Sequence, residues 1–260
     1  MSIKITPSDK IPRLNSILAW REILGSFDMF TIDAETTSIC TVCNNDKAKH
    51  YAKYGTIRCI CKLQKEQYIY THSSIMQDIK TPLNNVDLDM LQIWGNTENQ
   101  DNLITTLDIV KEWLIWPNQW LFLGGNPGCG KTHILQSIAI ILGNFAVYIS
   151  ANHFEYKIKE AIDKGTVTEI LHILKGIPFL IMDDLGSEYY KNDSWVKSQI
   201  RNIIDHRYNQ HDEKPTLFAS NLNKEALRRY DQRTASRILD KSSGNIVIAM
   251  NIGDYRTDGD

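Results

Sequence analysis

The stretch from Gly125 to Thr132 constrains this chain more than any other, because it reads G-N-P-G-C-G-K-T and fits G-x-x-x-x-G-K-[ST] at every fixed position. A short apolar run at 120–123 precedes it, and residues 133–142 carry apolar side chains at helical spacing. Strand, glycine loop and helix therefore follow in the order that a phosphate-binding P-loop requires. The plain alternative is an ordinary glycine-rich turn before a helix, and the flanking elements argue against it.

The residue types of this loop suit a triphosphate. Glycines let the backbone curl around an anion without Cβ clashes, and the helix that follows points the positive end of its dipole at the anion. Lys131 is expected on the β- and γ-phosphates, and the Thr132 hydroxyl on Mg²⁺. The sequence thus predicts a site for ATP and Mg²⁺ formed by Gly125, Asn126, Pro127, Gly128, Cys129, Gly130, Lys131, Thr132 and His133.

A pair of carboxylates follows a second apolar run. Residues 179–182 are apolar and lead directly into Asp183 and Asp184, the pattern of a Walker B strand. Asp183 is expected to hold Mg²⁺ through its water shell, and Asp184 to orient or deprotonate the attacking water. A buried strand that ends in a solvated acidic turn would look the same, but the P-loop about fifty residues upstream favours the catalytic interpretation.

Asn221 and Arg237 are further candidates for the ATP site because of their positions in the series of predicted strands and helices. Asn221 closely follows an apolar run at 216–219 and could hydrogen-bond the γ-phosphate or the lytic water. Arg237, like Arg233 before it, lies on a short predicted helix and could stabilise charge on the γ-phosphoryl group, including that of a neighbouring subunit. A routine turn residue and a solvated basic face are the alternatives.

The order of elements predicts the fold class. From residue 119 onward strands and helices alternate, which predicts an α/β fold whose parallel sheet is covered by helices on both faces. The expected strands are 120–123, 145–149, 179–184, 216–219 and 245–250. The expected helices are 13–24, 86–93, 102–113, 133–142, 153–164, 167–175, 194–210, 224–230 and 232–239. Residues 62–100 lack strong periodicity and are interpreted as a connector.

The cysteines indicate a second, smaller domain. Of five cysteines, Cys129 lies in the P-loop and the others form two close pairs, Cys40 with Cys43 and Cys59 with Cys61. Four thiolates can close a tetrahedral Zn²⁺ site and hold together a module too small for a core of its own. His50 could replace one cysteine, and free thiols are the alternative. The predicted domains are a zinc-binding domain at 1–80, a linker at 81–100 and an ATPase domain at 101–256.

Composition excludes few functions. The net charge of -2 gives no global argument for nucleic acid, so such a contact needs a local patch. The first thirty residues lack the pattern of a secretory signal, and no apolar run approaches eighteen residues. We therefore expect a cytoplasmic protein without a membrane span.

Several motifs together resemble a known family. The matching stretches are GNPGCGKTH at 125–133, MDDLGSE at 182–188, IIDHRY at 203–208, ASNL at 219–222, SRI at 236–238 and the closing residues 251–256. As a set they resemble the DnaC/DnaI helicase loaders and their IstB relatives in the AAA+ class, over about residues 100–256. The N-terminal cysteines are similar to the zinc module of DnaI-type loaders.

The resemblance implies roles for these residues. Asn221 would be the sensor 1 residue and Arg237 the arginine finger that acts in trans, with Arg233 the less favoured finger. The chain departs from the pattern at Asp184, where many AAA+ proteins have the longer Glu, so hydrolysis is expected to be slow. Because the sequence stops soon after the last predicted strand, we expect no helical lid and no sensor 2 arginine.

The resemblance also implies partners. ATP would assemble the chain into a homo-oligomeric spiral, single-stranded DNA would run through its centre, and the N-terminal domain would grip a hexameric replicative DNA helicase. Candidate DNA contacts are Tyr189, Tyr190 and Lys191, where rings could stack on bases. A second set is Phe154, Tyr156 and Lys157. Core packing or plain surface is the alternative for both sets.

The function that follows is ATP-dependent loading of a replicative helicase onto single-stranded DNA. One alternative is an IstB-like transposition helper ATPase that assembles on duplex DNA and recruits a transposase. A third possibility is a regulatory ATPase or decoy that binds a helicase or loader without loading anything.

Overall fold

The computed structural model describes residues 48–51, 55–58, 74–88, 91, 97–115, 117, 119–187, 194–211 and 213–258. The chain divides into two units, residues 1–39 and 40–260. Everything described here belongs to the second unit.

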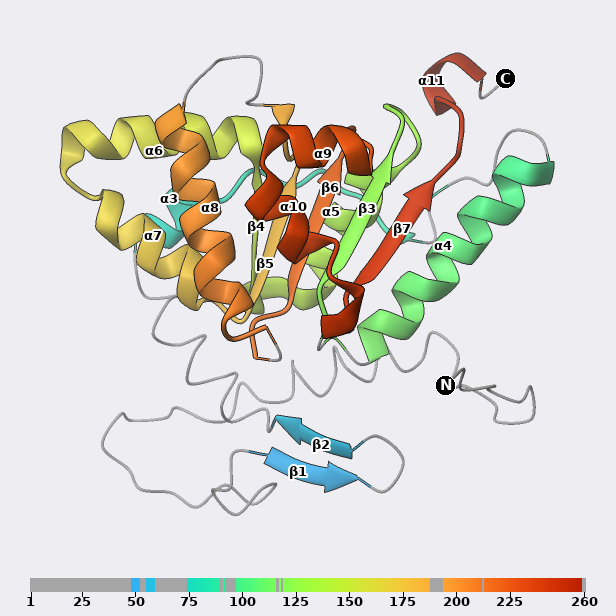
Figure 1. Ribbon diagram of the computed structural model, residues 1–260, viewed down its shortest axis with the longest axis horizontal. Coiled ribbons are helices and arrows are strands. Elements are labelled where there is room, and N and C mark those ends of the chain that lie inside the picture. Colours follow the sequence, from blue (N-terminus) through green and yellow to red (C-terminus); the bar gives the residue numbers. More distant parts are fainter. Residues whose placement is uncertain are drawn as a thin grey trace. The chain divides into compact units, whose positions relative to one another are not determined.

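A five-stranded parallel sheet forms the centre of the ATPase domain (Figure 1). Its strands lie in the order β4-β5-β6-β3-β7. Their bounds are β3 (Leu121–Gly125), β4 (Ala146–Ser150), β5 (Phe179–Asp183), β6 (Thr216–Ser220) and β7 (Ile246–Met250). Each of the five predicted strands is confirmed to within two residues, because buried parallel strands are short, continuous apolar runs that are easy to see in a sequence.

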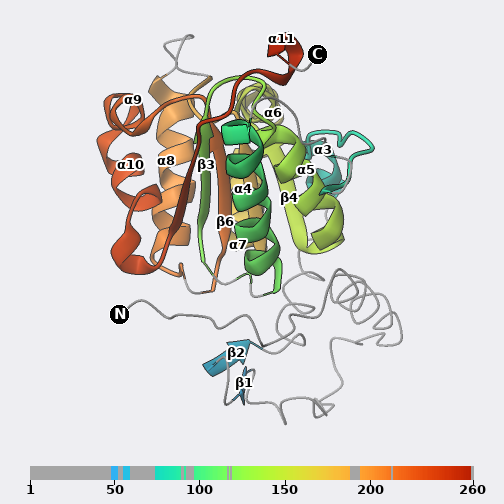
Figure 2. The ribbon, with the colours of Figure 1, turned by 90° about the vertical axis from the view of Figure 1, so that its right-hand side faces the viewer.

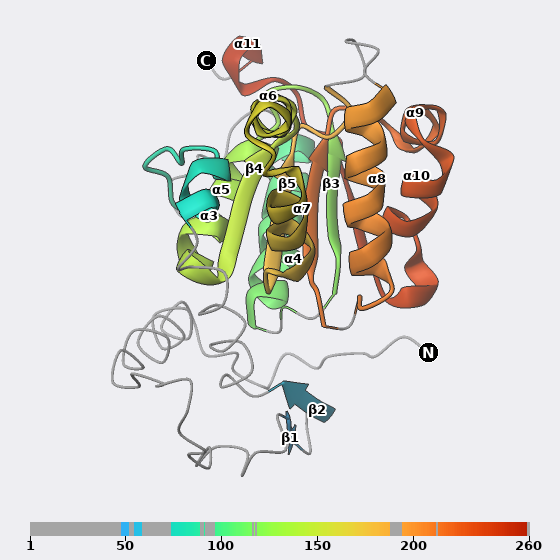
Figure 3. The same cartoon turned by 90° about the vertical axis from the view of Figure 1, so that its left-hand side faces the viewer.

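Helices cover both faces of this sheet. Figure 2 shows α8, α9 and α10 on one side of the strands and α4 and α5 on the other, and Figure 3 shows the same division from the opposite edge. The predicted α/β class is thereby confirmed. The helices are α3 (Ser74–Ile79), α4 (Thr97–Ile115), α5 (Lys131–Leu142), α6 (Ala151–Lys164), α7 (Val167–Gly176), α8 (Ser194–Tyr208), α9 (Lys224–Tyr230), α10 (Gln232–Ile238) and α11 (Tyr255–Asp258), with 3₁₀ turns at Gly143–Phe145 and Lys241–Ser243.

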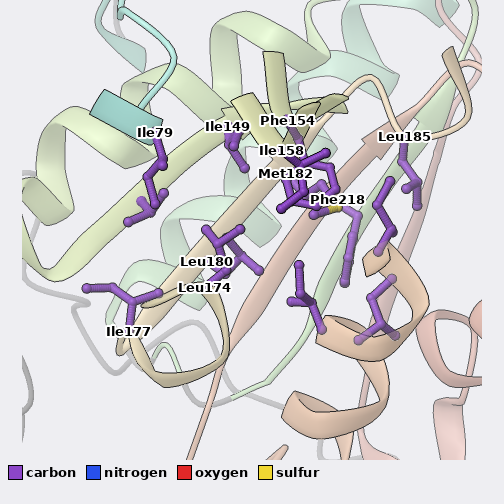
Figure 4. Packing of buried hydrophobic residues seen from close by; sticks show 14 of the residues in the cluster. Ile79, Ile149, Phe154, Ile158, Leu174, Ile177, Leu180, Met182, Leu185 and Phe218 are labelled. Atoms are coloured by element: carbon purple, nitrogen blue, oxygen red, sulfur yellow. The ribbon is translucent and has the colours of Figure 1, made fainter. Parts of the chain in front are cut away.

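Successive side chains of a strand point to opposite faces of the sheet, so the core has one layer on each face. On the face toward α7 and α8, side chains from β4, β5 and β6 pack with those of α6; Figure 4 shows Phe154 and Ile158 beside Met182 and Phe218. Phe154 is completely buried. The suggestion that Phe154 contacts DNA is therefore wrong, because its ring already serves as core.

A short helix upstream of the predicted ATPase domain also belongs to this core. Residues 62–100 are predicted from the sequence to be a connector, but α3 buries Met76 and Ile79 completely in the same cluster as the sheet. Asp78 of this helix pairs with Lys157 of α6 at 2.7 Å. The predicted boundary at residue 80 thus falls one residue after a helix that packs on the ATPase core.

The segment after α3, residues 81–88, is here called the strap. The Thr81 N–H donates to the Tyr148 carbonyl at 3.0 Å, and the Ser150 N–H donates to Thr81 Oγ1 at 2.9 Å. These bonds cover the edge strand β4, whose backbone groups would otherwise be open to pairing with another chain. Farther along, the Asp87 carbonyl accepts from His133 Nε2 at 2.6 Å, so the strap runs from the edge of the sheet to the start of α5.

The helix predicted at 86–93 is not found over residues 86 and 87, which have no helical structure. Backbone groups of the strap hydrogen-bond to side chains and strands of the ATPase domain instead of to one another in a helix. An Asn84 N–H bond to Gln136 is one example. A helical period in a short segment is thus overridden by tertiary contacts.

A buried arginine joins three segments at the opposite, amino-terminal end of the strands. Arg207 of α8 is completely buried, and its Nε donates to Thr216 Oγ1 at 2.8 Å. Its two terminal nitrogens donate, at 2.8 to 3.3 Å, to the carbonyls of Leu174, Lys175, Ile177, Pro178 and Pro215. The end of α7 is in this way fastened to the starts of β5 and β6.

In the cysteine-rich region the structure describes one β-hairpin. Strands β1 (Ala48–Tyr51) and β2 (Gly55–Arg58) pair antiparallel, with Ala48 opposite Arg58. Cys40, Cys43, Cys59 and Cys61 lie outside the described residues, as does the helix predicted at 13–24. Zinc binding stays a prediction. Among the residues described, no helix is both long and apolar enough to cross a bilayer.

Candidate nucleotide-binding site

The sequence-predicted ATP site gathers at the carboxyl ends of the parallel strands, uppermost in Figure 1. Strand β6 lies between β3, which leads into the P-loop, and β5, which ends in the carboxylates. Residues that follow these three strands therefore meet at one edge of the sheet, where ligands bind in open α/β sheets.

The backbone of the P-loop has the shape that an anion requires. Gly128 and Gly130 have φ of 76° and 95°, a left-handed conformation that glycine adopts without strain. Gly130 is the N-cap of α5, and no side chain in the described part of the chain caps this helix. The first N–H groups of α5 are thus left for an anion to accept from, and Thr132 is exposed beside them.

The P-loop lysine is buried and held by its own loop. Lys131 Nζ donates to the carbonyls of Gly125 at 2.8 Å and Asn126 at 2.7 Å, and contacts the buried Cys129 Sγ at 3.5 Å. Bonds to neutral carbonyls are weaker than bonds to phosphate oxygens. This ammonium group can therefore exchange its present acceptors for a phosphate with little movement.

Asp183 is the most buried acid of the site, with 1% exposure. Its Oδ2 accepts from the Tyr148 hydroxyl at 2.7 Å, and its Oδ1 accepts from the Asp184 N–H at 2.8 Å. Two donors, one from the middle of β4 and one directly after β5, thus fix the orientation of the carboxylate that is predicted to hold Mg²⁺.

Asp184 has two unusual properties. Its φ is 53°, which is uncommon for a residue other than glycine and tends to mark functional sites. Burial, and then the charge of Asp183, raise the pKa of the Asp184 carboxyl, while the charge of Lys131 partly opposes the shift. A raised pKa makes a carboxylate a better proton acceptor, which suits the predicted role in activating water.

The turn that carries Asn221 is tied to the turn after Asp184. Ser220 Oγ donates to the Leu185 carbonyl at 2.5 Å and accepts from the Leu222 N–H at 3.0 Å. Asn221 itself is exposed. Its predicted place between the P-loop and the carboxylates agrees with the strand order, and its contact with a γ-phosphate stays a prediction.

The two candidate arginines lie elsewhere in the chain. Both are on α10, on the side of the sheet opposite α5 (Figure 2), and both form ion pairs with Asp205 of α8. Arg237 Nε lies 2.8 Å from Asp205 Oδ1, and its guanidinium lies 5.4 Å from the centre of the Tyr208 ring. The Arg237 side chain is 21% exposed and that of Arg233 60%. Neither is brought to the P-loop of its own chain, as a finger that acts in trans requires.

The candidate DNA contacts are only partly described. Tyr189, Tyr190 and Lys191 lie outside the described residues. In the second set Tyr156 is 63% exposed, whereas Lys157 is engaged with Asp78 and Glu160. DNA binding by the first set, and by Tyr156 and Lys157 of the second, stays a prediction.

Two groups at the site are not predictable from the motifs. Tyr148 was counted only as part of a buried strand, and only the burial of its hydroxyl beside Asp183 shows another role. The closing segment also reaches the P-loop: the Tyr255 N–H donates to the Gly128 carbonyl at 3.2 Å. A Cβ at Gly128 would lie 1.7 Å from Asp254 Oδ1, so another residue would displace the Asp254 side chain, and the positive φ of Gly128 also favours glycine there. Residues 251–256 were noted in the sequence, but only as part of a resemblance.

Two curated proteins are similar to part of this chain. The chain is 34% identical to the replicative helicase loader DnaI of Bacillus subtilis over 122 residues, 44% of this chain and 37% of that protein. It is 30% identical to the chromosomal replication initiator protein DnaA of Mesoplasma florum over 125 residues, 45% of this chain and 27% of that protein. The matches thus span about a third of these relatives' own length. The first of them confirms the resemblance to helicase loaders.

Solved structures agree on the fold. A structure of DnaA from Aquifex aeolicus bound to AMPPCP matches with a TM-score of 0.54 and 24% identity, over 68% of this chain and 54% of that one. A crystal structure of DnaI matches with a TM-score of 0.50 and 21% identity, over 65% of this chain and 90% of that one. At these identities the likeness shows the fold alone, and it agrees with the predicted parallel sheet covered by helices. A family model described as the bacterial DnaA ATPase domain matches residues 89–242, more than half of the chain, and the chain therefore belongs to that family.

Proposed function

We propose that this protein is an ATP-dependent loader of a replicative DNA helicase onto single-stranded DNA. The observation that carries the proposal is the likeness to the protein named replicative helicase loader DnaI. A P-loop site is common to the whole DnaA ATPase family and by itself does not select a partner. The likeness to DnaI does, and it favours a loader over the transposition helper.

The ATPase part of the proposal assigns a task to each residue of the site. Lys131 and the N–H groups that open α5 bind the triphosphate, and the Thr132 hydroxyl and Asp183 hold Mg²⁺. Asp184 takes the proton of the attacking water, and Asn221 orients that water or the γ-phosphate. The buried Lys131, the doubly held Asp183 and the raised pKa of Asp184 support these assignments.

The oligomer part of the proposal rests on Arg237. We assign it as the finger that stabilises charge on the γ-phosphoryl group bound by a neighbouring subunit. Its ion pair with Asp205 and its place over the Tyr208 ring support the proposal, because they hold the guanidinium in one orientation before a neighbour arrives.

A mixing experiment tests this assignment. Lys131→Ala has a dead site and an intact finger, whereas Arg237→Ala has an intact site and no finger. Each should hydrolyse ATP at least tenfold more slowly than the wild type, and an equimolar mixture should recover part of the activity. Arg233→Ala, which changes the other partner of Asp205, is the matched control. No recovery in the mixture, or an equal loss from Arg233→Ala, would contradict the assignment.

The partner part of the proposal places helicase binding in the N-terminal region, with Zn²⁺ held by Cys40, Cys43, Cys59 and Cys61. The test is size-exclusion chromatography with light scattering on the protein mixed with a hexameric replicative helicase, in ATP and in ADP. A shortened version should begin at residue 74, because α3 supplies Met76 and Ile79 to the ATPase core. The Cys40→Ser, Cys43→Ser double variant of the full chain repeats the test without truncation.

We expect a nucleotide-sensitive complex that requires residues 1–73 and the cysteines. The protein should also bind a fluorescent single strand in ATP more tightly than the matching duplex. Absence of any complex, together with a preference for duplex DNA, would overturn the loader function.

A further inference from the structure

Three hydrogen bonds, two of them buried and the outermost one part-buried, join the strap to the carboxylate of Asp183. The Asn84 N–H donates to Gln136 Oε1 at 3.3 Å, Gln136 Nε2 donates to the Tyr148 hydroxyl oxygen at 3.2 Å, and that hydroxyl donates to Asp183 Oδ2 at 2.7 Å. We call this chain of bonds the Asp183 relay. The side chains of Gln136, Tyr148 and Asp183 are each at most 5% exposed.

The fold explains why these residues meet. Strands β4 and β5 are parallel, with Tyr148 opposite Ile181 and Ser150 opposite Asp183. Because alternate residues share a face, Tyr148 and Asp183 project from the same side of the sheet as diagonal neighbours. Helix α5, which begins at the P-loop, packs on this side and supplies Gln136. The relay therefore joins the P-loop helix, the edge strand and the carboxylate strand.

The Tyr148 hydroxyl is not needed for packing. A phenylalanine would fill almost the same volume in this layer, and burying a hydroxyl costs free energy unless it is hydrogen-bonded. The hydroxyl lies 2.7 Å from Asp183 Oδ2 and donates to it, so this buried hydroxyl is satisfied by the carboxylate.

We propose that Tyr148 is a positioning residue for the Mg²⁺-holding carboxylate of Asp183 and that Gln136 positions Tyr148. The inference rests on the ATPase function proposed above and adds residues to the same site. Tyr148 and the Asp184 N–H each occupy one oxygen of Asp183, so the carboxylate cannot turn without losing a bond. The lone pairs that remain point in fixed directions, and outer partners of this kind tune how a carboxylate holds a metal and its waters.

The outer end of the relay lies in the strap. Asn84 reaches Gln136 through its backbone, and the Thr81 N–H donates to the carbonyl of Tyr148 itself. The strap thus holds Tyr148 at its backbone and, through Gln136, at its hydroxyl. The orientation of Asp183 accordingly depends on a segment that joins the N-terminal region to the ATPase domain.

The test is Tyr148→Phe in the full chain, with ATP hydrolysis measured as a function of Mg²⁺ concentration. We expect kcat to fall, or the half-saturating Mg²⁺ concentration to rise, by about tenfold or more. Binding of a fluorescent ATP analogue in EDTA should stay within about twofold, because that contact is made by the P-loop. Tyr230→Phe, the same change at a buried tyrosine of α9, is the control and should leave both quantities unchanged.

Gln136→Leu tests the rest of the relay. It should shift the Mg²⁺ dependence in the same direction by a smaller factor, since Tyr148 still reaches Asp183. The double variant should be no worse than Tyr148→Phe alone, because residues of one network do not add.

The outcomes separate the two proposals. If the wild-type protein shows no Mg²⁺-dependent hydrolysis, the proposed ATPase function fails. If the wild type is active and Tyr148→Phe matches Tyr230→Phe in its Mg²⁺ dependence, the relay is overturned and the ATPase function stands. If Tyr148→Phe loses nucleotide binding in EDTA, its fold is damaged, and an unchanged Mg²⁺ dependence in Gln136→Leu then overturns the relay.

Discussion

Two buried cations occupy opposite ends of the same sheet and are held in different ways. Lys131, at the carboxyl ends of the strands, donates to carbonyls that lie five and six residues away in its own loop. Arg207, at the amino ends, donates to the end of α7 and to the starts of β5 and β6, eight to 33 residues away. A cation held by its own loop can release its acceptors to a ligand, whereas one shared by three segments cannot move without separating them. Distance in sequence to the acceptors thus distinguishes a binding cation from a structural one.

Arg207→Met should have the largest effect on folding. The change removes donors from buried carbonyls of three segments and should lower the free energy of unfolding by about 3–5 kcal/mol. Urea denaturation measures it, with Arg228→Met, a change at an exposed arginine of α9, as the control expected within about 0.5 kcal/mol. Equal losses of unfolding free energy in Arg207→Met and Arg228→Met would contradict the structural role of Arg207.

Lys131→Ala should act on ligand binding more than on folding. With ATP and Mg²⁺ at a hundred times the dissociation constant, the wild type should gain about 2.7 kcal/mol of stability, and the variant should gain almost none. Without nucleotide, the variant should lose less than about 1.5 kcal/mol, because the loop carbonyls it leaves are close to solvent. The measurement is denaturation with and without nucleotide. If Lys131→Ala without nucleotide lowers the free energy of unfolding as much as Arg207→Met does, the distinction between a binding cation and a structural cation is refuted.

Lys214→Met separates the effect of residue type from that of location. Lys214 is a buried lysine like Lys131, but it lies near Arg207, and its Nζ donates at 2.6 Å to the Gly176 carbonyl, 38 residues away. We expect a loss of about 1–2 kcal/mol in unfolding free energy and no change in nucleotide binding. A nucleotide-binding defect in this variant would show that the effect on nucleotide binding depends on losing a buried lysine and not on where the acceptors of that lysine lie.

The smallest effect should come from His206, beside Arg207 on α8. Burial, and then the charges of Lys175, Arg207, Lys214 and His172, lower the pKa of His206 below its usual value. The unfolded chain therefore binds the proton more readily, so the stability from this group is present above the unfolded pKa of about 6.5 and is lost as the pH falls toward the folded value. His206→Gln should flatten the slope of unfolding free energy between about pH 7 and pH 5. An unchanged slope would mean that neither burial nor these neighbouring charges lower the pKa of His206.

The sequence predicted the local features of the molecule well and the long-range ones poorly. The P-loop, the Asp183 strand and the parallel sheet follow from contiguous residues, so motif and periodicity were enough. The acceptors of Arg207 come from three segments, and its side chain carries no local mark in the 203–208 motif. Tyr148 and Gln136 likewise meet only when β4, β5 and α5 pack. Helix α3 is six residues long, too short for a clear period, and its two buried side chains are evident only from the core.

The strap has a thermodynamic consequence for the whole protein. If the Asp183 relay acts as proposed, a partner that moves the strap changes the free energy of the nucleotide-bound and nucleotide-free states by different amounts, because the strap contacts β4, Gln136 and His133. Linkage is reciprocal: the factor by which ATP changes affinity for that partner equals the factor by which the partner changes affinity for ATP. A coupling free energy of about 1.4 kcal/mol through the strap would therefore change the affinity for the partner tenfold when ATP binds, and the affinity for ATP tenfold when the partner binds.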